Sequence, residues 1–102
     1  MVIVATRFDV AMGKMNVALE WADKVWKVLE NAGGLGSKSW IIRGQTGQSN
    51  RVTFAGQYAS MGEFEEGLDK AFADPALQPL LTEMSNWCTG VERTIGKVIK
   101  ES

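Results

Sequence analysis

The sequence predicts an α+β fold, with a four-stranded antiparallel sheet that carries helices on one face. Three observations predict this fold. Short apolar runs with the two-residue alternation of strands stand at the beginning, the middle and the end of the chain. Longer segments with apolar residues at helical spacing lie between these runs. Glycine, proline and asparagine separate the segments, and the length of 102 residues fits a single domain, residues 1–102.

The first two predicted elements are a strand and a long helix. Val2–Phe8 alternates between two faces that both hold apolar groups, which predicts a central strand. A helix is predicted over Lys14–Asn31. It should end at Gly33-Gly34, because glycine readily adopts the left-handed conformation that closes many helices.

A hairpin and a second helix are predicted next. Lys38–Arg43 and Arg51–Tyr58 read as strands joined by a polar loop, Gly44–Asn50. The second helix should begin at Ser60, because Ser60 and Glu63 have the spacing of a capping box.

The last part of the chain is predicted as a short third helix and a strand. Asp74-Pro75 interrupts the second helix, since proline cannot continue a helix interior. The apolar residues that follow share one helical arc: Leu77, Leu80, Leu81, Met84, Trp87 and Cys88. Thr89-Gly90 is expected to be a turn and Val91–Ile99 the last strand. The resulting order, β-α-β-β-α-(α)-β, is the ferredoxin-like plan.

The helix predicted over Lys14–Asn31 has an unusually wide apolar arc. With residues placed at 100° steps, the polar side chains fill roughly 120° and the apolar ones roughly 200°. A helix on the outside of a small domain needs an apolar stripe of only about 100°. We therefore expect a second subunit, a bound molecule or both to cover the flanks that carry Trp21 and Trp26.

The two faces of the predicted sheet differ in composition. The face expected beneath the helices is large and apolar: Val4, Phe8, Trp40, Ile42, Val52, Phe54 and Tyr58. The opposite face is mixed: Ile3, Ala5, Arg7, Ser39, Ile41, Arg43, Arg51, Thr53, Ala55 and Gln57. Such a half-apolar profile is typical of a subunit interface. The last strand departs from this division, because its apolar positions share a side with two cations: Val91, Arg93, Ile95, Lys97 and Ile99.

Composition excludes several function classes. The net charge of −1 gives no general attraction to nucleic acid or to an anionic membrane, and no segment approaches the length of a membrane span. The single cysteine, Cys88, excludes an internal disulfide, fits the cytoplasm and is expected to be buried rather than reactive. The absence of histidine removes His-activated nucleophiles and His-ligated metals, and we expect no metal and no cofactor.

Several features in order along the chain carry a resemblance to a known family. They are the strand Val2–Phe8 with a Gly13-Lys14 step into a long helix, the Gly33-Gly34 break, Tyr58-Ala59-Ser60 leading into Glu63-Phe64, and Ala73-Asp74-Pro75-Ala76-Leu77. In these features the chain resembles the dimeric α/β-barrel superfamily, which includes the antibiotic-biosynthesis-monooxygenase-like and NIPSNAP-like proteins. The resemblance implies two subunits whose sheets pack face to face into one barrel.

The resemblance also implies a ligand cavity between each sheet and its helices. On this chain the cavity would be lined by Trp21, Trp26, Trp40, Phe54, Tyr58 and Trp87. Tryptophans at helical spacing are also ordinary core residues, so both interpretations stay open. Haem-degrading members of the superfamily use a histidine that this chain lacks, and Tyr58 stands where monooxygenase members often carry tryptophan.

Three functional hypotheses follow. The first is a homodimeric protein that binds a small aromatic or apolar molecule, including an anionic one. The second is a cofactor-independent monooxygenase or isomerase for a phenolic or quinol-like substrate, in which Tyr58, Arg7 or Arg43 would handle protons and negative charge. The third is a structural dimerisation module. The strand arginines fit either salt bridges between subunits or anion binding in a pocket.

Overall fold

The computed structural model describes residues 1–44 and 50–102. The elements, in chain order, are β1 (Val2–Val10), α1 (Met15–Ala32), β2 (Lys38–Arg43), β3 (Arg51–Tyr58), α2 (Met61–Ala73), α3 (Leu77–Glu83) and β4 (Cys88–Lys97). A 3-10 turn, Met84–Asn86, joins α3 to β4. Most of the predicted hairpin loop, residues 45–49, lies outside the described residues.

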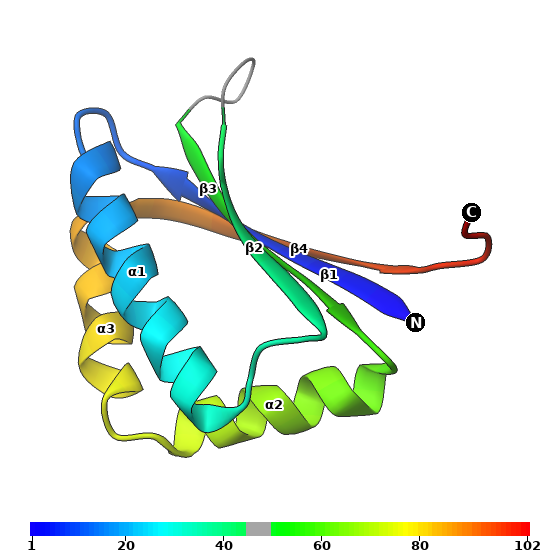
Figure 1. The fold of residues 1–102 in the computed structure, drawn as a ribbon. Coiled ribbons are helices and arrows are strands. Elements are labelled where there is room, and N and C mark those ends of the chain that lie inside the picture. Colours follow the sequence, from blue (N-terminus) through cyan, green and yellow to red (C-terminus); the bar gives the residue numbers. More distant parts are fainter. Residues whose placement is uncertain (45–49) are drawn as a thin grey trace.

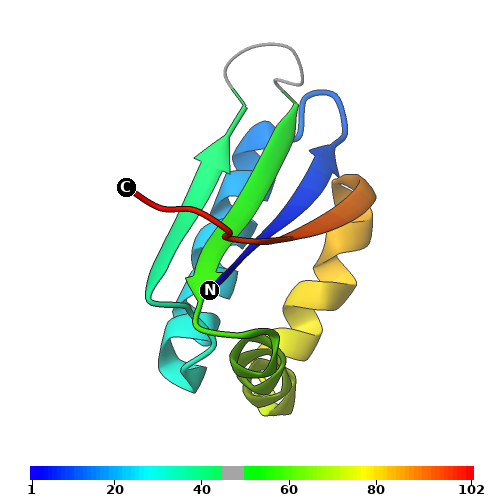
Figure 2. The ribbon, with the colours of Figure 1, turned by 90° about the vertical axis from the view of Figure 1, so that its right-hand side faces the viewer.

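The strands form one antiparallel sheet in the order β2-β3-β1-β4. All three helices lie on the same face of this sheet (Figure 1), with α1 behind β2 and β3 and α3 below the start of β4 in the perpendicular view (Figure 2). This is the predicted ferredoxin-like α+β architecture. β1 is a central strand, as predicted, because it pairs with both β3 and β4.

The capping residues predicted from the sequence are found at the end of α1 and at the start of α2. Gly33 has φ 75° and caps α1, and the following N–H of Gly34 donates to the carbonyl of Leu29 at 2.8 Å. At the start of α2, the Ser60 hydroxyl accepts a hydrogen bond from the Glu63 N–H at 3.2 Å. These contacts satisfy backbone groups that would otherwise be unpaired at the helix ends.

The core lies where α1 crosses the sheet and meets α3. Trp21 is buried, and its indole N–H donates to the Leu80 carbonyl of α3 at 2.7 Å. The Trp21 flank of the wide apolar arc is therefore covered within the chain, and no second subunit is needed there. The Trp26 flank is only half-buried.

The end of the chain differs from the prediction. α3 ends at Glu83, so Trp87 and Cys88 do not belong to a third helix. The predicted turn at Thr89-Gly90 was wrong, because these residues are part of β4, which ends at Lys97. The register shifts by one residue here, since Asp9 pairs with Gly90 and Val10 with Cys88. This β-bulge allows β4 to continue where turn-forming residues suggested a break.

The predicted faces of β2 were also wrong. Pairing with β3 places Trp40 beside Ala55 and Ile42 beside Thr53, on the face away from the helices. Ile41 instead packs against the core, and Ser39 and Arg43 share its side of the strand. Both sets of β2 positions contain bulky apolar residues, and the register with β3 decides which set faces the helices.

Candidate functional site: a cavity between the sheet and the helices

A cavity of about 220 Å³ lies between the sheet and the three helices. Strand residues that line it include Val4, Thr6, Phe8, Ser39, Phe54, Gly56, Tyr58, Val91 and Arg93. Helix residues that line it include Trp21, Val25, Trp26, Leu29, Phe64, Leu68, Phe72, Leu77, Leu81 and Met84. The lining is almost entirely apolar and comes from the sheet and from every helix.

Aromatic rings form one wall of the cavity. Phe8 lies 5.2 Å from Trp21 and 5.8 Å from Phe54 between ring centroids, in edge-to-face arrangements. Trp21 and Phe54 complete the cluster at 6.1 Å. Such pairs stabilise one another beyond their buried area, which favours this arrangement of the wall.

Trp87 stands behind this wall rather than in it. Its ring centroid lies 4.9 Å from that of Trp21, and it is buried, but it does not line the cavity. Its indole N–H has no hydrogen-bond partner in the part of the chain that the structure describes. Trp87 therefore supports Trp21, whereas the family resemblance implied that it lines the cavity.

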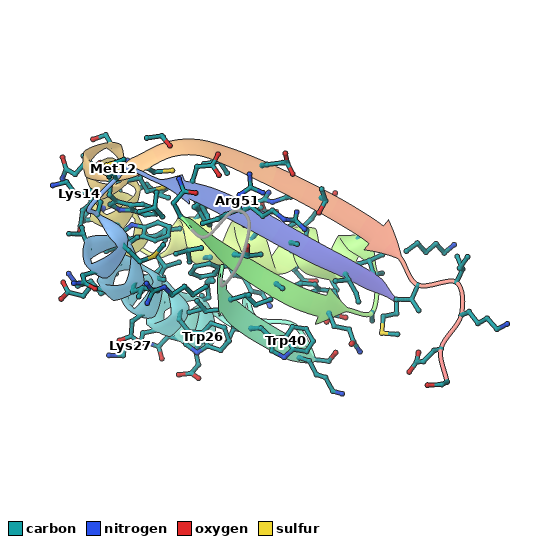
Figure 3. The ribbon with its side chains drawn as sticks, turned by 90° about the horizontal axis from the view of Figure 1, so that it is seen from above. Met12, Lys14, Trp26, Lys27, Trp40 and Arg51 are labelled. Carbon is teal, nitrogen blue, oxygen red and sulfur yellow. The ribbon has the colours of Figure 1, made fainter. Side chains whose placement is uncertain are left out.

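Trp26 and Trp40 lie at the β2 edge of the molecule (Figure 3). Both line the main cavity, and both also line a shallow recess between α1 and β2 with Asp23 and Ile41. Trp40 belongs to the open face of the sheet, and it reaches these spaces at the edge because β2 is an edge strand. Trp40 is 44% exposed. Five of the six residues that the resemblance implies for a ligand site line the cavity. Trp26 and Trp40 stand at its rim.

Tyr58 lines the cavity with its ring, but its hydroxyl is engaged elsewhere. The hydroxyl donates to the Gly34 carbonyl at 3.0 Å, and the ring packs edge-to-face on Phe64 at 5.1 Å. Gly56 leaves the space that the ring occupies, since a Cβ there would meet a Tyr58 ring carbon at 2.8 Å. Burial, with a smaller contribution from Glu63, raises the pKa of the Tyr58 hydroxyl, so it stays protonated at neutral pH.

We expect Tyr58→Phe to lower the free energy of unfolding by about 1 kcal/mol at pH 7, because the hydrogen bond to Gly34 is lost. The raised pKa means that the folded protein favours the protonated hydroxyl. This contribution is fully present below pH 10.0, the ordinary pKa, and is lost as the pH rises through the raised value. Urea unfolding of both proteins at pH 7 and above pH 10 measures this difference, which should shrink at high pH; a constant difference would contradict the assignment.

The other two catalytic candidates lie away from the cavity lining. Arg7 is on the open face of the sheet, where it donates to the Thr94 hydroxyl at 2.8 Å and lies 3.9 Å from the Glu92 carboxylate. Arg43 is exposed at the end of β2. The structure therefore does not bring Tyr58, Arg7 and Arg43 together in one site.

Arg93, one of the four strand arginines that fit either salt bridges or anion binding, is the charged residue of the cavity lining. It lies on β4 opposite Thr6, and its Nε donates to the Thr6 hydroxyl at 2.9 Å. Its signal in the sequence was an arginine within an otherwise apolar alternation, Val91-x-Arg93-x-Ile95. This side of β4 is on the helix face of the sheet, where Val91 and Arg93 line the cavity, while Val91 and Ile95 remain 55% and 47% exposed.

Within residues 1–44 and 50–102, no group of three or more Cys, Asp or Glu side chains is arranged to hold a metal ion. Over the same residues, no helix has the length and apolar character required to span a membrane.

Solved structures from several bacteria share this fold. A NIPSNAP family protein of unknown function from Agrobacterium tumefaciens is 16% identical with a TM-score of 0.80, covering 100% of this chain and 91% of that one. An uncharacterised NIPSNAP domain protein from Burkholderia xenovorans is 14% identical with a TM-score of 0.80, and each chain is covered completely.

A second group of structures consists of oxygenases. A variant of SnoaB, a cofactor-independent oxygenase from Streptomyces nogalater, is 16% identical with a TM-score of 0.66, covering 98% of this chain and 94% of that one. No protein-family model and no curated protein matches the chain. The structural likeness confirms the family resemblance at the level of the fold: the chain has the ferredoxin-like fold of the NIPSNAP and antibiotic-biosynthesis-monooxygenase-like proteins.

Proposed function

We propose that this protein binds a small aromatic or apolar molecule in the cavity between its sheet and its helices, and that it does so as a homodimer. The observation that carries the proposal is the cavity itself. Protein interiors pack densely and leave few voids larger than a water molecule. A partly open apolar space of about 220 Å³ with aromatic walls has the character of a small-molecule binding site.

The size of the cavity limits the ligand. An apolar cavity of about 150 Å³ accepts a benzene ring. The 220 Å³ available here suits one substituted ring or two fused rings. The edge-to-face cluster of Phe8, Trp21 and Phe54 offers ring faces and edges against which a flat molecule can pack.

Binding is favoured over catalysis by the polar groups available. The polar side chains of the lining are those of Thr6, Ser39, Tyr58 and Arg93. The Tyr58 hydroxyl donates a hydrogen bond to the Gly34 carbonyl. Because the pKa of this hydroxyl is raised, it stays protonated at neutral pH and is a poor base there. The cofactor-independent oxygenase chemistry named for SnoaB remains the alternative, and its support here is the shared fold.

The proposed dimer uses the open face of the sheet. Trp40 and Ile42 are 44% and 49% exposed on that face, and Ile3 is also exposed there. Two small residues, Ala5 and Ala55, pair at the centre of the face, so a second sheet can approach closely. Large apolar side chains around a flat centre are typical of a surface covered by a second copy.

A pair of variants on α3 tests the cavity as the binding site. We expect calorimetry to show one 2-naphthalenemethanol bound per chain. Leu81 lines the cavity, and Leu81→Trp should fill it and weaken binding at least about tenfold, or 1.4 kcal/mol. Thr82 is exposed on the same helix, so Thr82→Trp is the matched control and should bind like the wild type. Equal affinity for both variants, or no binding to the wild type, would contradict the proposal.

A further inference from the structure

Arg93 is anchored at the cavity by two contacts. Its Nε donates to the Thr6 hydroxyl at 2.9 Å, and its guanidinium carbon lies 5.3 Å from the centroid of the Phe64 ring. Thr6 and Phe64 themselves line the cavity. These two contacts position the guanidinium against the wall of the cavity, while Arg93 as a whole is exposed.

The charge of Arg93 has no acidic partner in the structure. Arg7 lies 3.9 Å from Glu92, and Arg51 lies 2.9 Å from Asp9. Arg93, by contrast, forms no ion pair with any residue in the described ranges 1–44 and 50–102. An arginine stays positively charged at any physiological pH, so the mouth of the cavity carries a cation that has no ion-pair partner among the described residues.

The geometry of the guanidinium selects the kind of anion. Because Thr6 occupies Nε, the two terminal nitrogens remain for an end-on, two-point contact. Two parallel N–H donors match the two oxygens of a carboxylate. The neighbouring positions on the same side of β4 are Val91 and Ile95, so the groups beside the anion would be apolar.

We propose that the ligand of this cavity is an aromatic carboxylate of one or two rings, an inference that rests on the proposed function of the cavity. The ring occupies the apolar space, and the carboxylate binds the terminal nitrogens of Arg93. Arg93 is thus the residue that determines specificity for an acid over a neutral molecule of the same shape. Anion binding was one of two interpretations of the four strand arginines in the sequence, and the other three, Arg7, Arg43 and Arg51, do not line this cavity.

The test compares 2-naphthoate with its neutral analogue, 2-naphthalenemethanol, by calorimetry. We expect the wild type to bind 2-naphthoate at least about tenfold more tightly, because charge-assisted two-point contacts are strong. Arg93→Met should remove this preference, so that 2-naphthoate binds no more tightly than 2-naphthalenemethanol. Measurable binding of 2-naphthalenemethanol to this variant shows that the cavity is still formed. Arg93→Lys keeps the charge but loses the planar fork, so it should retain part of the preference.

Lys97→Met is the matched control. Lys97 lies on the same side of the same strand and carries the same charge, but it does not line the cavity. We expect this variant to keep the full preference for 2-naphthoate. Equal binding of both compounds to the wild type, or loss of preference in Lys97→Met as large as in Arg93→Met, would overturn the inference and leave the proposed function standing. Failure of both compounds to bind would instead remove the proposed function.

Discussion

Gly36→Ala should lower the free energy of unfolding by about 3 kcal/mol or more, the largest effect that we expect from a single methyl group in this chain. A Cβ at this position would collide with the backbone carbonyl of Gln57 on β3. That carbonyl also accepts hydrogen bonds from the Ser37 N–H at 2.8 Å and the Ser37 hydroxyl at 3.1 Å. Moving the loop away from β3 therefore breaks several contacts at once.

The matched control is Gly62→Ala at the start of α2. A Cβ at Gly62 would meet only the Ser60 hydroxyl, at an ordinary contact distance of 3.7 Å. Alanine is the better helix former, so this variant should be as stable as the wild type or more stable by up to about 1 kcal/mol. Urea unfolding measures both variants. If Gly36→Ala unfolded within about 0.5 kcal/mol of the wild type, the close crossing of the loop over β3 would be wrong.

Ile42→Glu should convert the proposed dimer into a monomer. Ile42 lies on the open face of the sheet beside Thr53 of β3, and a symmetric interface would bury two copies of the new carboxylate without partners. An unpaired buried charge costs several kcal/mol, so we expect the dissociation constant to rise at least about 100-fold. Sedimentation equilibrium should change from twice the 11.2 kDa chain mass to the chain mass itself.

Val17→Glu provides the control for this experiment. Val17 is an exposed apolar residue of α1, and the helices lie on the opposite face of the sheet from Ile42. The variant should remain dimeric. A dimer that survives Ile42→Glu but separates in Val17→Glu would show that the subunits meet through the helices, and the proposed arrangement would be wrong.

Elements with strong local signals could be predicted from the sequence. Gly33 ends α1 and Ser60 begins α2 because the capping geometry depends on a few neighbouring residues. β1 and β3 were assigned to the correct faces because their large apolar residues occur at alternate positions. Each of these predictions depends only on residues within one or two helical turns, or within a few positions along the same strand.

The errors occur where a distant contact decides the structure. β2 has apolar residues at both alternations, Trp40 and Ile42 on one side and Ile41 on the other. Its orientation depends on the register with β3, which local pattern does not reveal. Likewise, the continuation of β4 through Gly90 depends on a bulge opposite Asp9. Side-chain size favoured the wrong face for β2, and turn propensity favoured the wrong end for β4.

The candidate site was predicted in part for the same reasons. The tryptophans were candidates from the sequence, and the fold brings Trp21 and Trp26 to one cavity and leaves Trp87 behind its wall. Arg93 could not be chosen from four strand arginines by sequence alone. The role that we propose for Arg93 depends on the alignment of β4 with β1 and on the acidic partners taken by Arg7 and Arg51.

The central claim is that the space between the sheet and the helices holds an aromatic ligand. Methyl-labelled NMR during titration with 2-naphthoate tests it most directly. We predict ligand contacts and shift changes at the methyl groups of Val25, Leu29 and Leu81, which line the cavity. Changes confined to Ile3 and Ile42 on the open face, or no change at any methyl group, would contradict the claim.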